Sequence, residues 1–188
     1  MKHYDRISLG ILAGGRASRL EGIDKAFARY ENQYLSQRIL NLLGVRFRET
    51  YISARGVDER FAEMNLQPVF DTRSSFSGPL AGIEALLDAT DCEYLLTMPV
   101  DIKFLPMDLI ADWLDNPQSP GHVLHDMNGL QPLLALWHVH GARIAVKQAL
   151  DMHEKAVHSV VSQLNFKVTT RTDIDIGNLN TPRDFEAP

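Results

Sequence analysis

The stretch LGILAGGRASRLEGIDK, residues 9–25, joins a short apolar strand to a glycine turn and then to a basic loop. Gly14 and Gly15 end the strand, because adjacent glycines allow positive φ and leave room for a ligand near the backbone. The cations of the loop are Arg16, Arg19 and Lys25. Free amides and fixed positive charge suit a polyphosphate, although an ordinary strand-to-helix turn with a solvated basic rim would show the same pattern.

The spacing of this stretch differs from two familiar nucleotide-binding motifs, GxxxxGK[ST] and GxGxxG. It resembles the LAGGxSxRMGxxDK signature of the molybdenum cofactor guanylyltransferases, which build the guanine dinucleotide form of molybdopterin. The chain reads LAGGRASRLEGIDK, with Leu20 and Glu21 where the signature has Met-Gly. Further matches follow in the family's order, namely GPLAG at 78–82, QPLLAL at 131–136 and NLNTP at 178–182.

Composition narrows the class of protein independently of these motifs. The chain has 188 residues, 45% of them hydrophobic and 23% charged, which suits one globular domain over 1–188 and is short for two. A formal net charge of −5 argues against a general nucleic-acid binder, and the single cysteine, Cys92, excludes an internal disulfide. No apolar run approaches the roughly 20 residues of a membrane span, and the N-terminus lacks the apolar core of a signal peptide. We therefore expect a cytoplasmic protein without nucleic-acid or membrane partners.

Strand-like and helix-like segments alternate along the chain, which predicts a three-layer, Rossmann-like α/β fold with a mostly parallel central sheet. An Asn-Gly pair at 128–129, between two apolar runs, predicts an antiparallel excursion in the C-terminal half. The expected helices cover 34–43, 57–64, 79–89, 107–114, 142–152 and 155–164, and the expected strands cover 7–12, 51–53, 68–70, 93–100 and 166–170. The resemblance implies the nucleotidyltransferase version of this fold, with a nucleotide-binding half at about 1–105 and a molybdopterin side at about 106–188.

Polar or conformationally permissive residues close four of the expected strands. They are the Gly14-Gly15 pair, Ser53, Asp71 and Asp101. The carboxyl ends of parallel strands meet at one edge of a sheet, and ligands bind outside that edge. We therefore expect these residues to converge on one site.

Asp101 directly follows the apolar run YLLTMPV, so it would stand at the mouth of the sheet. A carboxylate there could bind Mg²⁺ that is held partly by substrate phosphates, or it could cap the following segment. The resemblance assigns it the metal-binding Asp of a CDxP-like motif, although Lys103 occupies the proline position. The resemblance also implies that Lys25 and Arg19 stabilise the charge of the phosphates. Without the resemblance, both residues could be ordinary surface cations.

The resemblance implies a wider nucleotide site. Its residues would be Leu12, Ala13, Gly14, Gly15, Lys25, Ser53, Asp71, Gly78 and Asp101. Considered alone, Asp71 could accept hydrogen bonds from a guanine or ribose edge, or it could simply form a turn. Ser53 stands where the family often has Asn. Relatives that use CTP tend to show LAAG at the glycine turn. The LAGG form of this chain therefore favours GTP as the nucleotide.

The resemblance also implies that two residues of the second half, Lys155 and Asn180, contact the molybdopterin. Lys155 replaces the arginine of the family's Arg-Ser-Val/Leu element, which keeps the charge but loses the bidentate fork. Asn180, in NLNTP, could bind pterin or phosphate, or could cap a short terminal helix.

The reaction that the resemblance implies transfers GMP from Mg·GTP to the phosphate of molybdenum-molybdopterin and releases pyrophosphate. The partners would be GTP, molybdopterin and, transiently, other molybdenum cofactor proteins and recipient enzymes. Two alternatives stay open. One is a related nucleotidyltransferase that uses CTP or a sugar phosphate, and the other is a non-catalytic, cofactor-binding member of the family.

Overall fold

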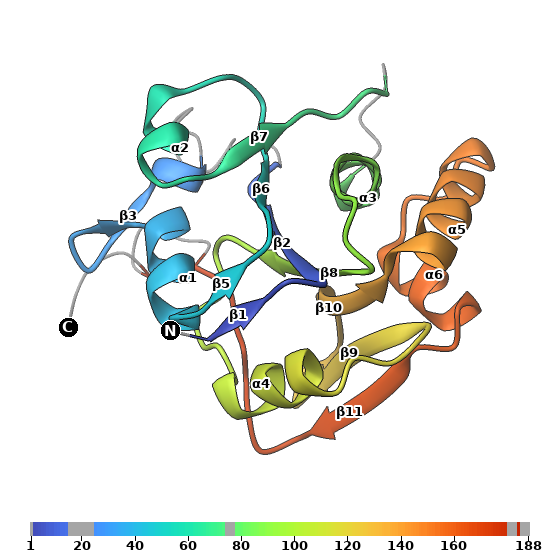
Figure 1. Cartoon of the computed structure of the whole chain (residues 1–188). Helices are drawn as coiled ribbons and strands as arrows, with labels where there is room; N and C mark the ends of the chain where they lie inside the picture. The colour runs from blue at the N-terminus through green and yellow to red at the C-terminus, as the bar shows by residue number, and fades with distance from the viewer. Residues whose placement is uncertain (1, 15–24, 74–77, 180–183, 185–188) are drawn as a thin grey trace.

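The strand of the opening stretch, β2 (Ile7–Leu12), lies inside a seven-stranded sheet in the computed structural model of the chain (Figure 1). The structure describes residues 2–14, 25–73, 78–179 and 184. Every residue of β2 is buried, as expected for a strand that is covered on both faces. Its two neighbours, β8 (Tyr94–Pro99) and β6 (Thr50–Ser53), both run parallel to it.

The sheet combines parallel and antiparallel pairs. Its spatial order is β11 (Lys167–Arg171), β9 (Gly121–Asp126), β10 (Gly129–His138), β8, β2, β6 and β7 (Gln67–Val69). β10 runs antiparallel to both β9 and β8, whereas the other neighbouring pairs in this sheet are parallel. Two short ladders pair β1 (His3–Tyr4) with β5 (Arg46–Phe47) and β3 (Arg29–Tyr30) with β4 (Gln33–Tyr34). The mostly parallel sheet with an antiparallel excursion in the C-terminal half is therefore confirmed.

Helices cover both faces of the sheet (Figure 1). They are η1 (Lys25–Phe27, a 3-10 helix), α1 (Leu35–Leu43), α2 (Glu59–Glu63), α3 (Pro79–Ala89), α4 (Met107–Asp115), α5 (Val139–Asp151) and α6 (Val157–Gln163). One core contains Ile39, Phe61 and Trp113 from α1, α2 and α4, and a second core contains residues of α3, α5 and α6. The expected three layers are present. None of the helices in the part of the chain described is long and apolar enough to span a membrane.

Most element boundaries follow the sequence pattern, with two informative differences. α1 buries Leu35 and Ile39 on one face, as its spacing predicts. α2 is shorter than the predicted 57–64 because Asp58 caps it, its Oδ1 accepting the Arg60 N–H at 3.0 Å. α5 begins at Val139, earlier than predicted, because β10 leads into it without an intervening loop.

His122 on β9 is a buried polar side chain. It is 2% exposed, and its ring stacks on Trp113 of α4 with the ring centroids 5.7 Å apart. Neither ring nitrogen has a hydrogen-bond partner within the described structure. Burial lowers the pKa of His122 below its ordinary value, and Lys167 adds to this effect while Asp112 opposes it. The imidazole is therefore buried in its neutral form.

The substitution His122→Phe is expected to weaken the pH dependence of stability between about pH 5 and 7. As pH falls through this window the unfolded histidine binds a proton more readily than the folded one, because the pKa is lowered in the folded state, so the free energy of unfolding of the wild type falls as pH falls. Urea unfolding at both ends of the window measures the effect. The exposed His140→Phe serves as control and should keep the wild-type dependence. Equal pH dependence in His122→Phe and wild type would contradict the expectation.

Candidate active site

The carboxyl ends of four parallel strands meet at one edge of the sheet. In the register, Leu12 of β2 lies between Ser53 of β6 and Pro99 of β8, and Ser53 in turn pairs with Val69 of β7. The residues that follow these strands at the edge are Gly14, Asp71 and Asp101. The expected convergence of the four strand ends is therefore present.

The glycine turn leaves the sheet at this edge. Leu12 and Ala13 are buried and remain bonded to neighbouring strands, since the Ala13 N–H donates to the Ser53 carbonyl at 3.2 Å and the Leu12 carbonyl accepts the Val100 N–H at 3.0 Å. Gly14 is the first exposed position of the turn. Gly15, predicted to contact the nucleotide, lies outside the described residues.

The hydroxyl of Ser53 lies in the space that two glycines leave open. A Cβ on Gly14 would lie 3.3 Å from Ser53 Oγ, and a Cβ on Gly82 would lie only 2.8 Å from it. Gly82 belongs to the first turns of α3 and to the GPLAG motif. The motif glycine thus allows α3 to approach the ends of β2 and β6 closely.

Asp101 and Lys25 form an ion pair beside this turn. Asp101 is 7% exposed and follows β8, and Lys25 begins η1. The position of η1 is fixed by the buried Ser36 of α1, whose Oγ donates to the Ala26 carbonyl at 2.9 Å. The sequence singles out both Lys25 and Asp101, and the structure brings their charged atoms into contact. Arg19, predicted to act with them, lies outside the described residues.

Arg38 of α1 supports the loop that carries Asp101, a role that the sequence analysis missed. Arg38 is buried, and its Nη1 and Nη2 donate to the carbonyls of Ile102 and Lys103 at 2.7 and 2.6 Å. These two bonds hold the loop at the position where the family's proline is replaced by Lys103. The available signal was a charged residue on the same helix face as Leu35 and Ile39.

The C-terminal segment packs onto the same loop. The Leu179 N–H donates to the Asp101 carbonyl at 2.8 Å, and Ile102 forms an isolated β-bridge with Asn178. The NLNTP motif therefore begins directly against Asp101. Asn180, the predicted molybdopterin contact within that motif, lies outside the described residues.

Asp126, at the end of β9, connects the hairpin to this segment and was also missed. Its Oδ2 accepts the Ile176 N–H at 3.1 Å, and its Oδ1 accepts from the Asn128 N–H at 2.8 Å and Gln131 Nε2 at 2.9 Å. Burial alone would raise the pKa of Asp126, but these hydrogen bonds outweigh it and hold the pKa below its ordinary value. Asp126 is thus a buried, charged acceptor that fixes the C-terminal segment.

Lys155 reaches this side of the molecule through the turn between α5 and α6. A Cβ on Gly78, at the start of α3, would lie 3.8 Å from the Lys155 carbonyl oxygen. Gly78 has φ +68°, a conformation that favours glycine. The turn itself is fixed by Glu154, whose Oε1 accepts the N–H groups of Lys155 and Ala156 at 2.7 and 2.8 Å. The predicted nucleotide and molybdopterin positions are therefore neighbours at Gly78.

Comparison with known proteins now identifies the family. The MobA-like NTP transferase domain matches residues 9–167. The molybdenum cofactor guanylyltransferase of Shewanella halifaxensis is 30% identical over 177 residues, which cover 92% of this chain and 88% of that protein. The chain belongs to this family. As a member it is a nucleotidyltransferase. The relative from Shewanella putrefaciens is 36% identical over 119 residues, 63% of this chain and 60% of that protein.

Solved structures show the same fold. Molybdopterin-guanine dinucleotide biosynthesis protein A from Archaeoglobus fulgidus superposes with a TM-score of 0.72 at 19% identity, covering 95% of both chains. The 2-C-methyl-D-erythritol 4-phosphate cytidylyltransferase of Thermus thermophilus gives a TM-score of 0.68 at 14% identity, covering 94% of both chains. At these identities the likeness concerns the fold, which family members share with nucleotidyltransferases named for other substrates.

Proposed function

We propose that the chain transfers GMP from Mg·GTP to the phosphate of molybdenum-molybdopterin and releases pyrophosphate. The observation that carries this proposal is the contact between Lys25 and Asp101 at the edge where the glycine turn leaves the sheet. The names of the curated relatives and the LAGG form of the turn support GTP as the nucleotide.

The nucleotide would bind along residues 12–15, Ser53, Asp71 and Gly78, in the half of the chain before about residue 105. Gly14 is exposed and carries no side chain, so a nucleotide can approach its backbone closely. Asp71 is exposed at the same edge, and its carboxylate would accept hydrogen bonds from the guanine or ribose.

Phosphate charge would be balanced by Lys25 and Arg19, with Asp101 as the protein ligand of Mg²⁺. Within the described residues no group of three or more His, Cys, Asp or Glu side chains forms a preformed metal cage. A single buried carboxylate such as that of Asp101 fits Mg²⁺ nevertheless, because this ion is usually held by one or two carboxylates together with substrate phosphates and water. When bound, the ion supplies charge neutralisation on the phosphates.

The acceptor would be held by Lys155 and Asn180, from the half after about residue 106. Its own phosphate is the nucleophile, so the chain needs no covalent nucleophile and acts by alignment and charge stabilisation. The proximity of Lys155 and Gly78 supports this arrangement, since it brings the two proposed substrate positions side by side.

Thermal unfolding with GTP, CTP, ATP and UTP, each with and without Mg²⁺, tests the nucleotide. We expect a Mg²⁺-dependent rise in the midpoint for GTP alone, because a ligand at about 100 times its Kd stabilises the folded state by about 2.7 kcal/mol. Release of pyrophosphate with molybdopterin then tests transfer. A shift with CTP alone would assign the chain to the cytidylyl activity, and binding without pyrophosphate release would assign a non-catalytic role. No shift with any nucleotide would refute the proposed site.

A further inference from the structure

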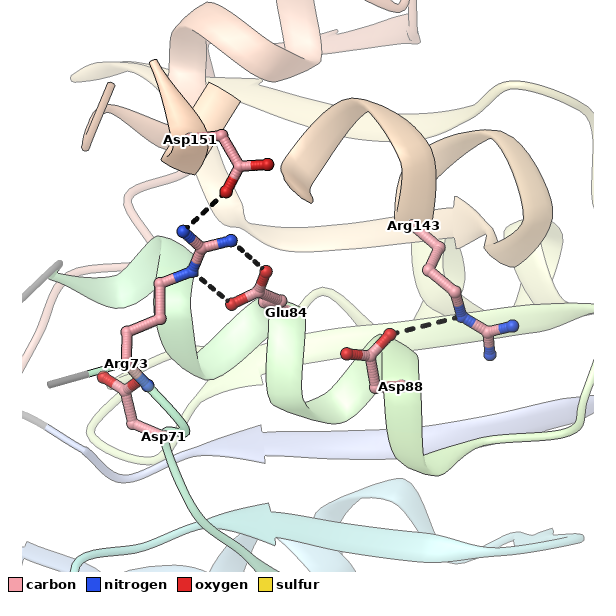
Figure 2. Close-up of polar contacts among 6 residues, drawn as sticks. All are labelled: Asp71, Arg73, Glu84, Asp88, Arg143 and Asp151. Atoms are coloured by element: carbon pink, nitrogen blue, oxygen red, sulfur yellow. Dashed lines mark hydrogen bonds and ion pairs between the residues drawn. The ribbon is translucent and has the colours of Figure 1, made fainter. Parts of the chain in front are cut away.

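Arg73 joins the segment after β7 to two helices (Figure 2). Its Nε and Nη2 donate to Glu84 Oε2 and Oε1 of α3 at 2.7 and 2.5 Å, a bidentate pair. Its Nη1 donates to Asp151 Oδ1, at the end of α5, at 2.9 Å. The side chains of Arg73 and Glu84 are 24% and 10% exposed. A bidentate pair that is partly removed from water fixes geometry better than an exposed ion pair.

The backbone of Arg73 also fixes the carboxylate of Asp71. The Arg73 N–H donates to Asp71 Oδ1 at 2.9 Å and closes a tight turn. The same residue therefore orients Asp71 through its backbone and anchors that turn to α3 through its guanidinium. The Asp71 side chain is exposed to solvent. The hydrogen bond from the Arg73 N–H holds its carboxylate in this turn.

The contact between Arg73 and Asp151 links Arg73 to the turn that carries Lys155, the proposed molybdopterin contact. Asp151 is the last residue of α5, and the following turn carries Lys155 against Gly78 at the start of α3. Arg73 thus connects the turn that carries Asp71, the helix α3 that follows Gly78, and the turn that carries Lys155.

We propose that Arg73 is a positioning residue that holds Asp71 for the nucleotide and fixes the turn carrying Lys155 relative to α3. This inference rests on the proposed function, in which Asp71 contacts the nucleotide. Arg73 touches neither substrate in this role, and acts through the two residues that it orients.

Arg143 provides a matched control in the same pair of helices (Figure 2). It extends from α5 to the far end of α3, where its Nη2 donates to the carbonyls of Leu87 and Thr90 at 2.6 and 2.9 Å and its Nε lies 3.5 Å from Asp88 Oδ1. Removing Arg143 breaks an α3–α5 connection of comparable extent at the opposite edge of the sheet, without disturbing Asp71 or Lys155.

The test measures the Kd of Mg·GTP by calorimetry for wild type, Arg73→Ala, Arg73→Lys, Glu84→Gln and Arg143→Ala, with thermal unfolding as a check of folding. Arg73→Ala should weaken binding about tenfold, and Glu84→Gln should act in the same direction. Arg73→Lys should recover only part of the loss, because a lysine lacks the fork. The Arg73→Ala/Glu84→Gln double variant should lose no more affinity for Mg·GTP than Arg73→Ala, since both changes break one network.

In turnover, Arg73→Ala should raise KM for GTP while kcat changes by less than about twofold.

Arg143→Ala should keep the wild-type Kd. A Kd for Arg73→Ala within twofold of wild type, or an equal loss in Arg143→Ala, would overturn the positioning role while leaving the proposed function intact. Wild type that binds CTP in place of GTP would overturn the GTP assignment, and the same series with CTP would then decide the role of Arg73. Wild type that binds no nucleotide overturns both proposals.

Discussion

The substitution Asp101→Asn is expected to lower the rate of pyrophosphate release by about 10²–10³-fold, with the protein still folded. Asparagine keeps the shape of the side chain and removes the negative charge. That charge pairs with Lys25 in the structure and would hold Mg²⁺ in the proposed reaction. The loss should be in kcat, because the charge matters most where phosphate charge develops in the transition state.

Stability should change little in this variant, for two reasons. The Lys25 side chain is 27% exposed, so its ammonium can be solvated once its partner is neutral. The loop backbone is held independently, by Arg38 and by the Leu179 N–H. The exposed Asp88→Asn, at the far end of α3, removes the same charge away from the edge and should retain full activity. Near-normal pyrophosphate release by Asp101→Asn would refute the role of Asp101.

The substitution Gly121→Ala is expected to lower the free energy of unfolding by about 3 kcal/mol or more. Gly121 begins β9 with φ +153° and pairs with Trp137 of β10. A Cβ at this position would lie 2.3 Å from the Leu136 carbonyl oxygen and 2.6 Å from the ring of Phe166. Because the oxygen belongs to the neighbouring strand, the clash can be relieved only by moving β9 relative to β10.

Substitutions at two other glycines separate the effect of the steric clash from that of backbone strain. Gly129→Ala introduces a side chain at φ +110° with nothing within 4 Å of its Cβ, so it isolates backbone strain and should cost about 1 kcal/mol. Gly56→Ala meets no atom within 4 Å and should be close to neutral. Urea unfolding of the three variants should give the order Gly121, Gly129, Gly56 in decreasing loss. A Gly121→Ala protein as stable as Gly129→Ala would show that the strands adjust without cost.

The architecture and the convergence of the strand ends at one edge could be predicted because they depend on local pattern. Apolar runs end at Leu12, Ile52, Phe70 and Val100, and the rule that parallel strands share an edge brings the polar or glycine residues that follow them together. The contact between Lys25 and Asp101 is a consequence of that rule together with the position of η1 against α1, which no local pattern encodes.

The supporting residues could not be predicted, since their partners are distant in sequence. Arg38 interrupts the apolar face of α1, and a sequence cannot show that its guanidinium finds the carbonyls of Ile102 and Lys103. Asp126 is typical of a hairpin turn, and its bond to Ile176 depends on the path of the chain after β11. No turn residue marks the start of α5 at Val139 in the sequence, because β10 continues directly into the helix.

The docking of residues 176–179 on the Asp101 loop has a consequence for the order of events during synthesis. The glycine turn, Lys25 and Asp101 leave the ribosome well before this segment does. Until residues 176–179 emerge, the Asp101 carbonyl and Asp126 lack the N–H groups of Leu179 and Ile176. The nascent chain can therefore form early those parallel strands that precede this segment, while the loop that carries Asp101 acquires its final support only after residues 176–179 have left the ribosome.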